Sequence, residues 1–189
     1  MLVLLSGYSG TGKSSIAKML VDKHRWRRVI TCTTRPKRIS ETNEYIFMDN
    51  DIFETFEVNN QFVEVTEYHA SFGDVKYGTL KWLIDDAIKS NLPYVLVVDP
   101  NGLQYYCNEY ADQVIPFILE ADMGVLYERL VQRQDTSQEI ERRLQSDIQQ
   151  FECVNIPKAI HINANLSKEH VCDHIVCETD YWCKNHNHV

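Results

Sequence analysis

The sequence lacks the long apolar stretches and the surplus of basic residues that mark several large protein classes. No apolar run among its 189 residues approaches the roughly 20 residues that cross a bilayer. Leu2–Leu5 is shorter than the core of a secretory signal peptide, so we expect a cytoplasmic protein with no membrane partner. Lysine and arginine number 19 against 27 acidic residues, and the net charge of −8 argues against general nucleic-acid binding.

The six cysteines also lack the spacing of a familiar metal or disulfide framework. Cys172, Cys177 and Cys183 lie near the C-terminus among several histidines, but four and five residues separate them and no CxxC pair occurs. Without a secretory signal we expect reduced thiols. We therefore interpret residues 171–189 as a polar tail.

The hydrophobic pattern predicts a parallel α/β sheet. Short apolar segments predict strands buried on both faces at Leu2–Ser6, Arg28–Cys32, Tyr94–Asp99, Val114–Leu119 and Ile160–Asn163. Helical periodicity lies between them at Ser14–Lys23, Leu80–Ile88, Met123–Val131 and Ile140–Phe151. Strands that alternate with helices are typical of parallel sheets.

Two regions interrupt this alternation. Residues 33–77 mix aromatic and polar residues, and Tyr45–Phe47 and Phe62–Val65 in this region have the pattern of short strands. They predict a small sheet inserted into the main fold. Gln132–Arg142 is polar and contains no glycine or proline, which predicts an exposed, mobile helical hairpin.

A glycine-rich segment after the first predicted strand has the spacing of a phosphate-binding loop. Gly7-Tyr-Ser-Gly-Thr-Gly-Lys13-Ser14 fits the pattern G-x-x-x-x-G-K-S/T, with a strand before it and a helix after it. Its glycines allow successive N–H groups to turn toward one anion. We expect Lys13 to contact the β and γ phosphates of a nucleotide and the Ser14 hydroxyl to bind Mg²⁺. The loop alone does not distinguish a hydrolase, a kinase and a switch.

Further motifs follow the loop. Thr31-Cys-Thr-Thr-Arg35-Pro-Lys-Arg38 holds two arginines three residues apart, which can bind a second phosphate. Phe62-Val-Glu64-Val-Thr-Glu67-Tyr68 and Tyr77-Gly78-Thr79 come next. Together with the phosphate loop, these motifs resemble the guanylate kinases, in order and as far as Asn165. The resemblance implies an enzyme that uses ATP and Mg²⁺ to phosphorylate GMP or dGMP.

The resemblance also implies an architecture. We expect a three-layer P-loop fold with a parallel five-stranded core sheet, an inserted small β subdomain that binds the nucleoside monophosphate, and a helical lid. Residues 1–30, 80–125 and 150–189 would form the core, 31–79 the inserted subdomain and 126–149 the lid, all within one domain, 1–189. Whether the protein is a monomer or a dimer is not predicted.

Family positions assign roles to individual residues. The resemblance places ATP on Gly7, Ser9, Gly10, Thr11, Gly12, Lys13, Ser14, Ser15 and Arg129. It places the phosphate of GMP on Arg35, Arg38, Tyr45 and Tyr77, and the base on Thr31, Glu64 and Thr79. A carboxylate can accept two parallel N–H bonds from guanine, which adenine does not offer. Glu64 matches the family segment, and Glu67 stays open as the alternative.

Three further residues are expected at the site. The resemblance implies that Arg133 and Arg143 are catalytic lid residues that fold over the phosphates. Asp99 ends the strand that begins at Tyr94, at the carboxyl edge where α/β sheets bind ligands. It is therefore expected near Mg²⁺ or against the substrate, with helix capping as the alternative.

Other functions stay open as alternatives. Related kinases accept other deoxynucleoside monophosphates or ribose 1,5-bisphosphate, although a glutamate that reads a base has no use in a sugar kinase. Guanylate kinase-like domains of scaffold proteins bind peptides without catalysis, and they typically lack an intact phosphate loop. A regulatory GTPase is disfavoured because the sequence has no N/T-K-x-D motif.

Overall fold

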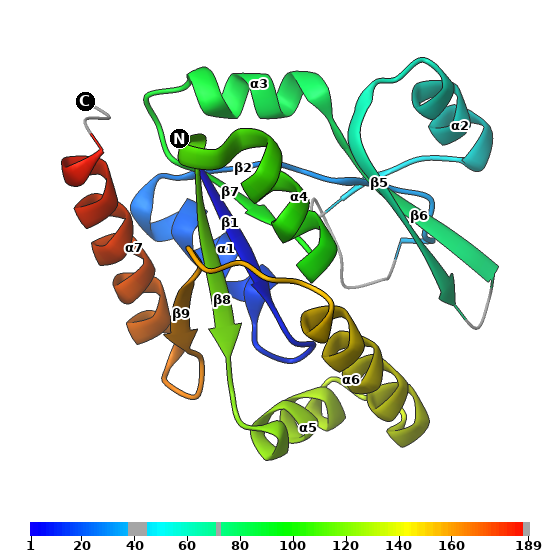
Figure 1. The fold of residues 1–189 in the computed structure, drawn as a ribbon. Coiled ribbons are helices and arrows are strands. Elements are labelled where there is room, and N and C mark those ends of the chain that lie inside the picture. Colours follow the sequence, from blue (N-terminus) through cyan, green and yellow to red (C-terminus); the bar gives the residue numbers. More distant parts are fainter. Residues whose placement is uncertain (38–44, 71–72, 187–189) are drawn as a thin grey trace. The chain divides into compact units, whose positions relative to one another are not determined.

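The structure is a computed structural model that describes residues 1–37, 45–70 and 73–186 (Figure 1). The chain divides into two compact units. Unit 1 comprises Met1–Arg28 and Asn91–Val189, and unit 2 comprises Val29–Ser90. Unit 2 is thus a continuous segment, whereas unit 1 is built from two.

Unit 1 contains a five-stranded parallel sheet with β1 (Leu2–Gly7) at its centre. The other strands, in spatial order around β1, are β2 (Arg27–Arg28) and β7 (Tyr94–Val97) on one side and β8 (Val114–Glu120) and β9 (Ile160–Asn163) on the other. Every residue of β1 is buried, as its apolar sequence requires. The predicted parallel five-stranded sheet is confirmed.

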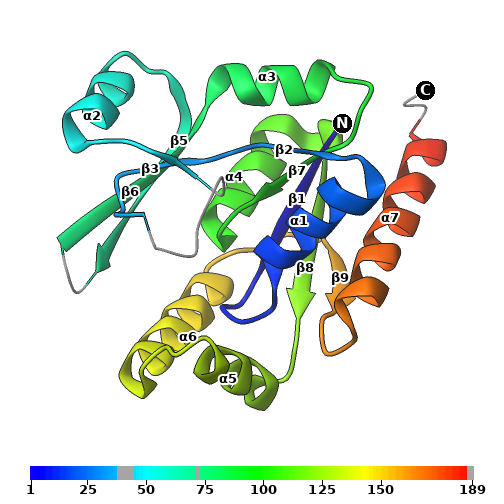
Figure 2. The ribbon, with the colours of Figure 1, turned by 180° about the vertical axis from the view of Figure 1, so that it is seen from behind.

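Helices cover both faces of this sheet. α1 (Lys13–His24) and α4 (Pro100–Tyr110) lie on opposite faces, which the two views from opposite sides show (Figures 1 and 2). α7 (Lys168–Asn185) packs beside α1 on the same face. The other helices of unit 1 are α5 (Met123–Gln132), α6 (Ser137–Glu152) and a 3₁₀ turn, Ala111–Gln113.

Unit 2 contains a four-stranded sheet and two helices. Its strands, in spatial order, are β4 (Ile46–Phe47), β3 (Cys32–Thr33), β6 (Gly73–Leu80) and β5 (Phe62–Ala70). β6 runs antiparallel to both neighbours, and α2 (Asn50–Val58) and α3 (Lys81–Lys89) follow β4 and β6 in the chain. Cys32, Phe53, Phe62 and Leu80 form its core. The predicted inserted sheet is present. β5 is longer than the strand predicted at Phe62–Val65, and β4 is shorter than the one predicted at Tyr45–Phe47.

The single strand predicted at Arg28–Cys32 is wrong. Arg27–Arg28 forms the edge strand β2 of unit 1, and Cys32–Thr33 forms β3 in the other sheet. The helical hairpin predicted at Gln132–Arg142 corresponds to the end of α5 at Gln132, a connecting turn and the start of α6 at Ser137, and most of its residues are exposed. Its mobility stays a prediction. Thr136 caps α6 by accepting from the Glu139 N–H, and Ile140 is fully buried.

The polar tail predicted at 171–189 is a packed helix over most of its length. Ser167 caps α7 by accepting from the His170 N–H (3.3 Å), and Val171, Cys172 and Ile175 are buried in the main core of unit 1. The apolar stripe is narrow, which is why the polar composition concealed it. In the described part of the chain, no helix has the length and apolarity that a membrane span requires.

Candidate active site

The glycine-rich segment forms a tight loop between β1 and α1. Gly7 has a φ of +146°, and a Cβ there would clash with the Leu119 carbonyl oxygen of β8. Gly10 has a φ of +89°, and a Cβ there would lie 3.0 Å from the Leu126 carbonyl oxygen of α5. Only glycine fits these positions without displacing backbone atoms. The pattern therefore reflects close packing of the loop against two neighbouring elements.

Lys13 lies at the start of α1 and turns back into this loop. Its ammonium group donates to the carbonyl oxygens of Gly7 (2.6 Å) and Tyr8 (3.0 Å). Burial above all, together with the nearby Arg133, lowers the pKa of Lys13 to about 8, although the carboxylates of Asp147 and Asp99 oppose the shift. The ammonium is thus held at the loop and loses its proton more readily than an exposed lysine.

The rest of the loop presents small polar groups at the helix N-terminus. Thr11 is buried, and its hydroxyl donates to the Tyr8 carbonyl oxygen (2.8 Å). Gly12 is the N-cap of α1 and has no side chain to cover the first N–H groups of the helix, and Ser14 and Ser15 are exposed beside it. An anion at this end meets N–H groups and the positive end of the helix dipole.

Arg129 connects the loop to two other parts of unit 1. Its guanidinium group donates to the Ala164 carbonyl oxygen (2.9 Å) and, at 3.5 Å, to the Gly10 carbonyl oxygen. Arg129 belongs to α5, and Ala164 directly follows β9. The arginine therefore lies against the phosphate loop, and its role toward ATP stays a prediction.

The two other arginines expected in the lid have different environments. Arg133 follows the last residue of α5 and is exposed. Its charge is close enough to lower the pKa of Lys13. Arg143 on α6 is half-buried and lies 3.5 Å from carboxylate oxygens of both Asp135 and Glu139. Arg143 is thus paired with acidic residues of its own unit in this structure.

Asp99 adopts the capping role that the sequence left as an alternative. Its carboxylate accepts from the Gly102 N–H (2.6 Å) at the N-terminus of α4, and Pro100 occupies the first turn. The same carboxylate is close enough to raise the pKa of Lys13. Asp99 therefore stabilises α4 and adds negative charge near the loop.

Unit 2 holds a second candidate anion site, centred on Arg35. Arg35 is only 7% exposed, and its Nε donates to the Tyr77 hydroxyl (3.1 Å). The guanidinium carbon lies 5.4 Å from the centre of the Tyr45 ring and 5.6 Å from that of Phe47. These aromatic rings orient the arginine.

The backbone around Arg35 is fixed by β6. The Thr33 hydroxyl donates to the Lys76 carbonyl oxygen (2.9 Å), and the Lys76 N–H donates to the Thr34 hydroxyl (2.9 Å). The Arg35 N–H donates to the Thr33 hydroxyl (3.1 Å). The two threonines thus act as structural residues that hold Arg35 in place, a role that the sequence analysis did not assign.

The strand register separates Glu64 from Glu67. Thr66 lies opposite Tyr77 and Glu67 opposite Lys76, so Tyr77 and Lys76 point to different faces of the hairpin. The buried Thr79, on the Tyr77 face, donates from its hydroxyl to Glu64 (2.8 Å). Glu64 therefore shares the face of the arginine and tyrosine groups, and Glu67 does not.

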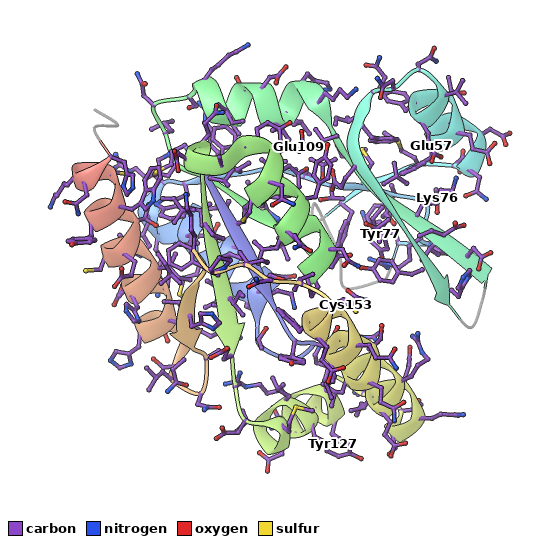
Figure 3. The ribbon with its side chains drawn as sticks, viewed as in Figure 1. Glu57, Lys76, Tyr77, Glu109, Tyr127 and Cys153 are labelled. Carbon is purple, nitrogen blue, oxygen red and sulfur yellow. The ribbon has the colours of Figure 1, made fainter. Side chains whose placement is uncertain are left out.

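The opposite face of the hairpin carries an ion pair. Lys76 donates to the Glu57 carboxylate of α2 (2.8 Å), and Figure 3 labels both residues together with Tyr77. The hydrogen bond with Glu57 raises the pKa of Lys76 most, and the charge of Glu67 raises it further. Glu67 thus belongs to a partly exposed charge cluster on the far side of the sheet from Glu64.

Two expected residues of unit 2 remain. Thr31 directly precedes β3, and its carbonyl oxygen accepts from the Ile46 N–H (3.0 Å). Arg38 lies outside the described residues, so its expected position at the second phosphate stays a prediction.

Comparison with known proteins identifies the family. The guanylate kinase family model matches residues 1–170. The chain belongs to the guanylate kinase family. It is 32% identical to a guanylate kinase of Mycoplasma genitalium over 88% of this chain and 70% of that protein. It is 30% identical to one of Rickettsia bellii, over 96% of this chain and 87% of that protein.

A guanylate kinase crystal structure from Anaplasma phagocytophilum has the same fold, with a TM-score of 0.70 and 20% identity. The match covers 96% of this chain and 85% of that one. The family match extends to residue 170, and most of α7 lies beyond it. The family assignment therefore rests on the residues that build both candidate sites.

The structure of this guanylate kinase family member contains two residues near the sites that the sequence analysis missed. Asp147 of α6 accepts from the Ser9 N–H of the phosphate loop (2.6 Å). Tyr68 of β5 contacts the edge of the Tyr77 ring, with ring centres 5.6 Å apart. No local pattern marks Asp147, because 138 positions separate it from Ser9. Among the described residues, no group of three acidic, histidine or cysteine side chains could hold a metal ion.

Proposed function

We propose that this protein transfers the γ-phosphoryl group of ATP to GMP or dGMP, forming ADP and GDP or dGDP. One observation carries the choice of acceptor: Glu64 and Thr79 lie on the same face of the β5–β6 hairpin as Tyr77. The Tyr77 hydroxyl in turn accepts a hydrogen bond from Arg35. That arrangement offers a cation for a phosphate and a carboxylate for a base edge. Membership of the guanylate kinase family supports the proposal.

The acceptor would bind through its two ends. Its phosphate would bind Arg35 and the hydroxyls of Tyr45 and Tyr77, with Arg38 as a further expected ligand. The carboxylate of Glu64 would accept the N1–H and 2-amino protons of guanine, while Thr79 and Thr31 would contact the base. Adenine lacks this pair of donors, so the carboxylate selects guanine.

ATP would bind at the phosphate loop. The loop N–H groups and Lys13 would hold the phosphates, and Arg129 would contact the nucleotide from α5. Mg²⁺ would bind the Ser14 hydroxyl, which is exposed beside the loop, and Asp99 provides a nearby carboxylate. These oxygen ligands suit Mg²⁺, which supplies charge neutralisation on the transferred phosphoryl group.

Catalysis would depend on positioning and electrostatics. Two anionic substrates repel one another, and Lys13, Arg133 and Arg143 would neutralise charge as the phosphoryl group moves. We assign 126–149 as a lid that excludes water, 31–79 as the part that binds the acceptor, and the remaining residues as the core. The direct transfer needs no covalent intermediate on the protein.

The test is ADP release from ATP and Mg²⁺ with a panel of acceptors: GMP, dGMP, AMP, CMP, UMP, dTMP and ribose 1,5-bisphosphate. We expect release with GMP and dGMP alone. Lys13→Ala, assayed in parallel, controls for contaminating kinases. Release with another acceptor would overturn the guanine assignment, and ATP binding without release would indicate a binding module.

A further inference from the structure

The phosphate loop already has an internal anionic partner. Asp147 of α6 accepts from the Ser9 N–H at 2.6 Å. Burial is the largest influence on the pKa of Lys13, and among neighbouring charges that of Asp147 is the largest and raises it. A phosphate loop binds anions through its N–H groups and its lysine. Asp147 thus places a carboxylate against groups that bind a nucleotide phosphate in such loops.

A second contact holds α6 in this position. The rings of Tyr8, in the loop, and Phe151, on α6, are tilted against each other with centres 4.8 Å apart. Tyr8 also packs against the cluster of Leu126, Leu130, Ile140 and Leu144, which joins α5 to α6. One turn of α6 therefore contacts the loop through both a polar and an aromatic side chain.

The same helix carries Arg143, whose guanidinium group lies near the carboxylates of Asp135 and Glu139. In this structure, a loop N–H and a lid cation that are expected to meet phosphate both have carboxylate partners from the same unit. For a phosphate to bind these groups, each carboxylate would have to give up its contact.

We propose that Asp147 competes with the phosphates of ATP for the phosphate loop and thereby lowers the affinity of the protein for ATP. The proposal rests on the proposed ATP site. A carboxylate near the loop repels a nucleotide in proportion to its phosphate charge. The effect is therefore large for ATP, smaller for ADP and absent for adenosine.

The test uses Asp147→Asn, because asparagine removes the charge while its carbonyl oxygen can still accept from the Ser9 N–H. Calorimetric titration without Mg²⁺ is done at pH 6, where Lys13 keeps its charge in both proteins even though the loss of Asp147 lowers its pKa further. It should show roughly five- to tenfold tighter ATP binding, a smaller gain for ADP and no change for adenosine. Steady-state assays should show a lower KM for ATP with the KM for GMP unchanged. The matched control is Glu141→Gln, which removes one exposed charge from the same helix and should change ATP affinity little.

The outcomes separate the two proposals. If the unaltered protein binds ATP and Asp147→Asn binds it equally or more weakly, the role of Asp147 is overturned while the ATP site stands. Equal gains from Asp147→Asn and Glu141→Gln would also overturn it, because the effect would then reflect net charge alone. If neither protein binds ATP, the proposed ATP site is wrong and the role of Asp147 fails with it.

Discussion

The two candidate anion sites are built in opposite ways. The phosphate loop of unit 1 is a single run of residues that offers backbone N–H groups and one lysine. The Arg35 site of unit 2 consists of side chains from four separate segments, which the sheet brings together. A backbone site is encoded by local spacing and by glycines, whereas a side-chain site depends on strand register.

The comparison predicts that the loop depends on its lysine more than the side-chain site depends on any one residue. Lys13→Ala should reduce phosphoryl transfer on the order of a thousandfold, because the developing phosphate charge loses its nearest cation. Steady-state ADP release measures this loss, and thermal unfolding serves as the control for folding. Retention of more than a tenth of the activity would contradict the assignment of Lys13.

The corresponding change in unit 2 is Arg35→Ala. We expect kcat/KM for GMP to fall roughly a hundredfold, because a charge-assisted contact with the acceptor phosphate is lost. The affinity for ATP should change little. Arg35→Lys is the matched variant: it keeps the charge but cannot reproduce the Nε contact with Tyr77, so an intermediate loss is expected. A change confined to ATP affinity would refute this role.

The two glutamates of β5 test whether strand register decides the base contact. Glu64→Gln should lower kcat/KM for GMP about thirtyfold, because the amide replaces one of two accepting oxygens with a donor. Glu67→Gln lies on the other hairpin face and should have little effect. ADP release with GMP at saturating ATP measures both. Equal losses in the two variants, or a larger one in Glu67→Gln, would reverse the assignment.

The smallest expected effect is a change of activity with pH. It distinguishes a site that depends on a lysine from one that depends on arginines. Because the pKa of Lys13 is lowered to about 8, its charged form is lost as pH rises through that value. The kcat/KM for ATP, which reports the free protein, should fall about tenfold between pH 7 and pH 9. The kcat/KM for GMP is expected to keep its value longer, because arginine stays charged. Lys13→Arg should flatten the ATP profile, and a flat profile in the unaltered protein would contradict the prediction.

The parts of the fold that were predicted from the sequence have local signals. β1, the loop and α1 follow directly from an apolar strand, the glycine spacing and a helical stripe. The spacing of Arg35 and Arg38 indicated a second phosphate site without the family. Glu64 and Tyr77 were assigned to it only through the resemblance, because nothing local in the sequence indicates that strand pairing brings them to one face. The split between β2 and β3 likewise depends on tertiary pairing rather than on the apolar pattern of 28–32.

Other features were missed for identifiable reasons. α4 begins at an aspartate followed by proline, a recognisable start signal, but its aromatic and polar residues conceal the periodicity. The contact between Asp147 and Ser9 joins two distant segments and leaves no local trace. A local signal was thus hidden in α4 by its composition, whereas the contact between Asp147 and Ser9 has no local signal at all.

The central position of β1 has a consequence for biosynthesis. β1 pairs with β7 from residue 94 and with β8 from residue 114. Both edges of β1 therefore stay without a hydrogen-bonded neighbour until these later strands are synthesised. At about 5–20 residues per second, the ribosome needs several seconds more to reach them. All of unit 2, residues 29–90, is synthesised in that interval. During that interval the apolar segment of β1 has neither of its neighbouring strands, so its burial in the sheet depends on residues that are synthesised after unit 2.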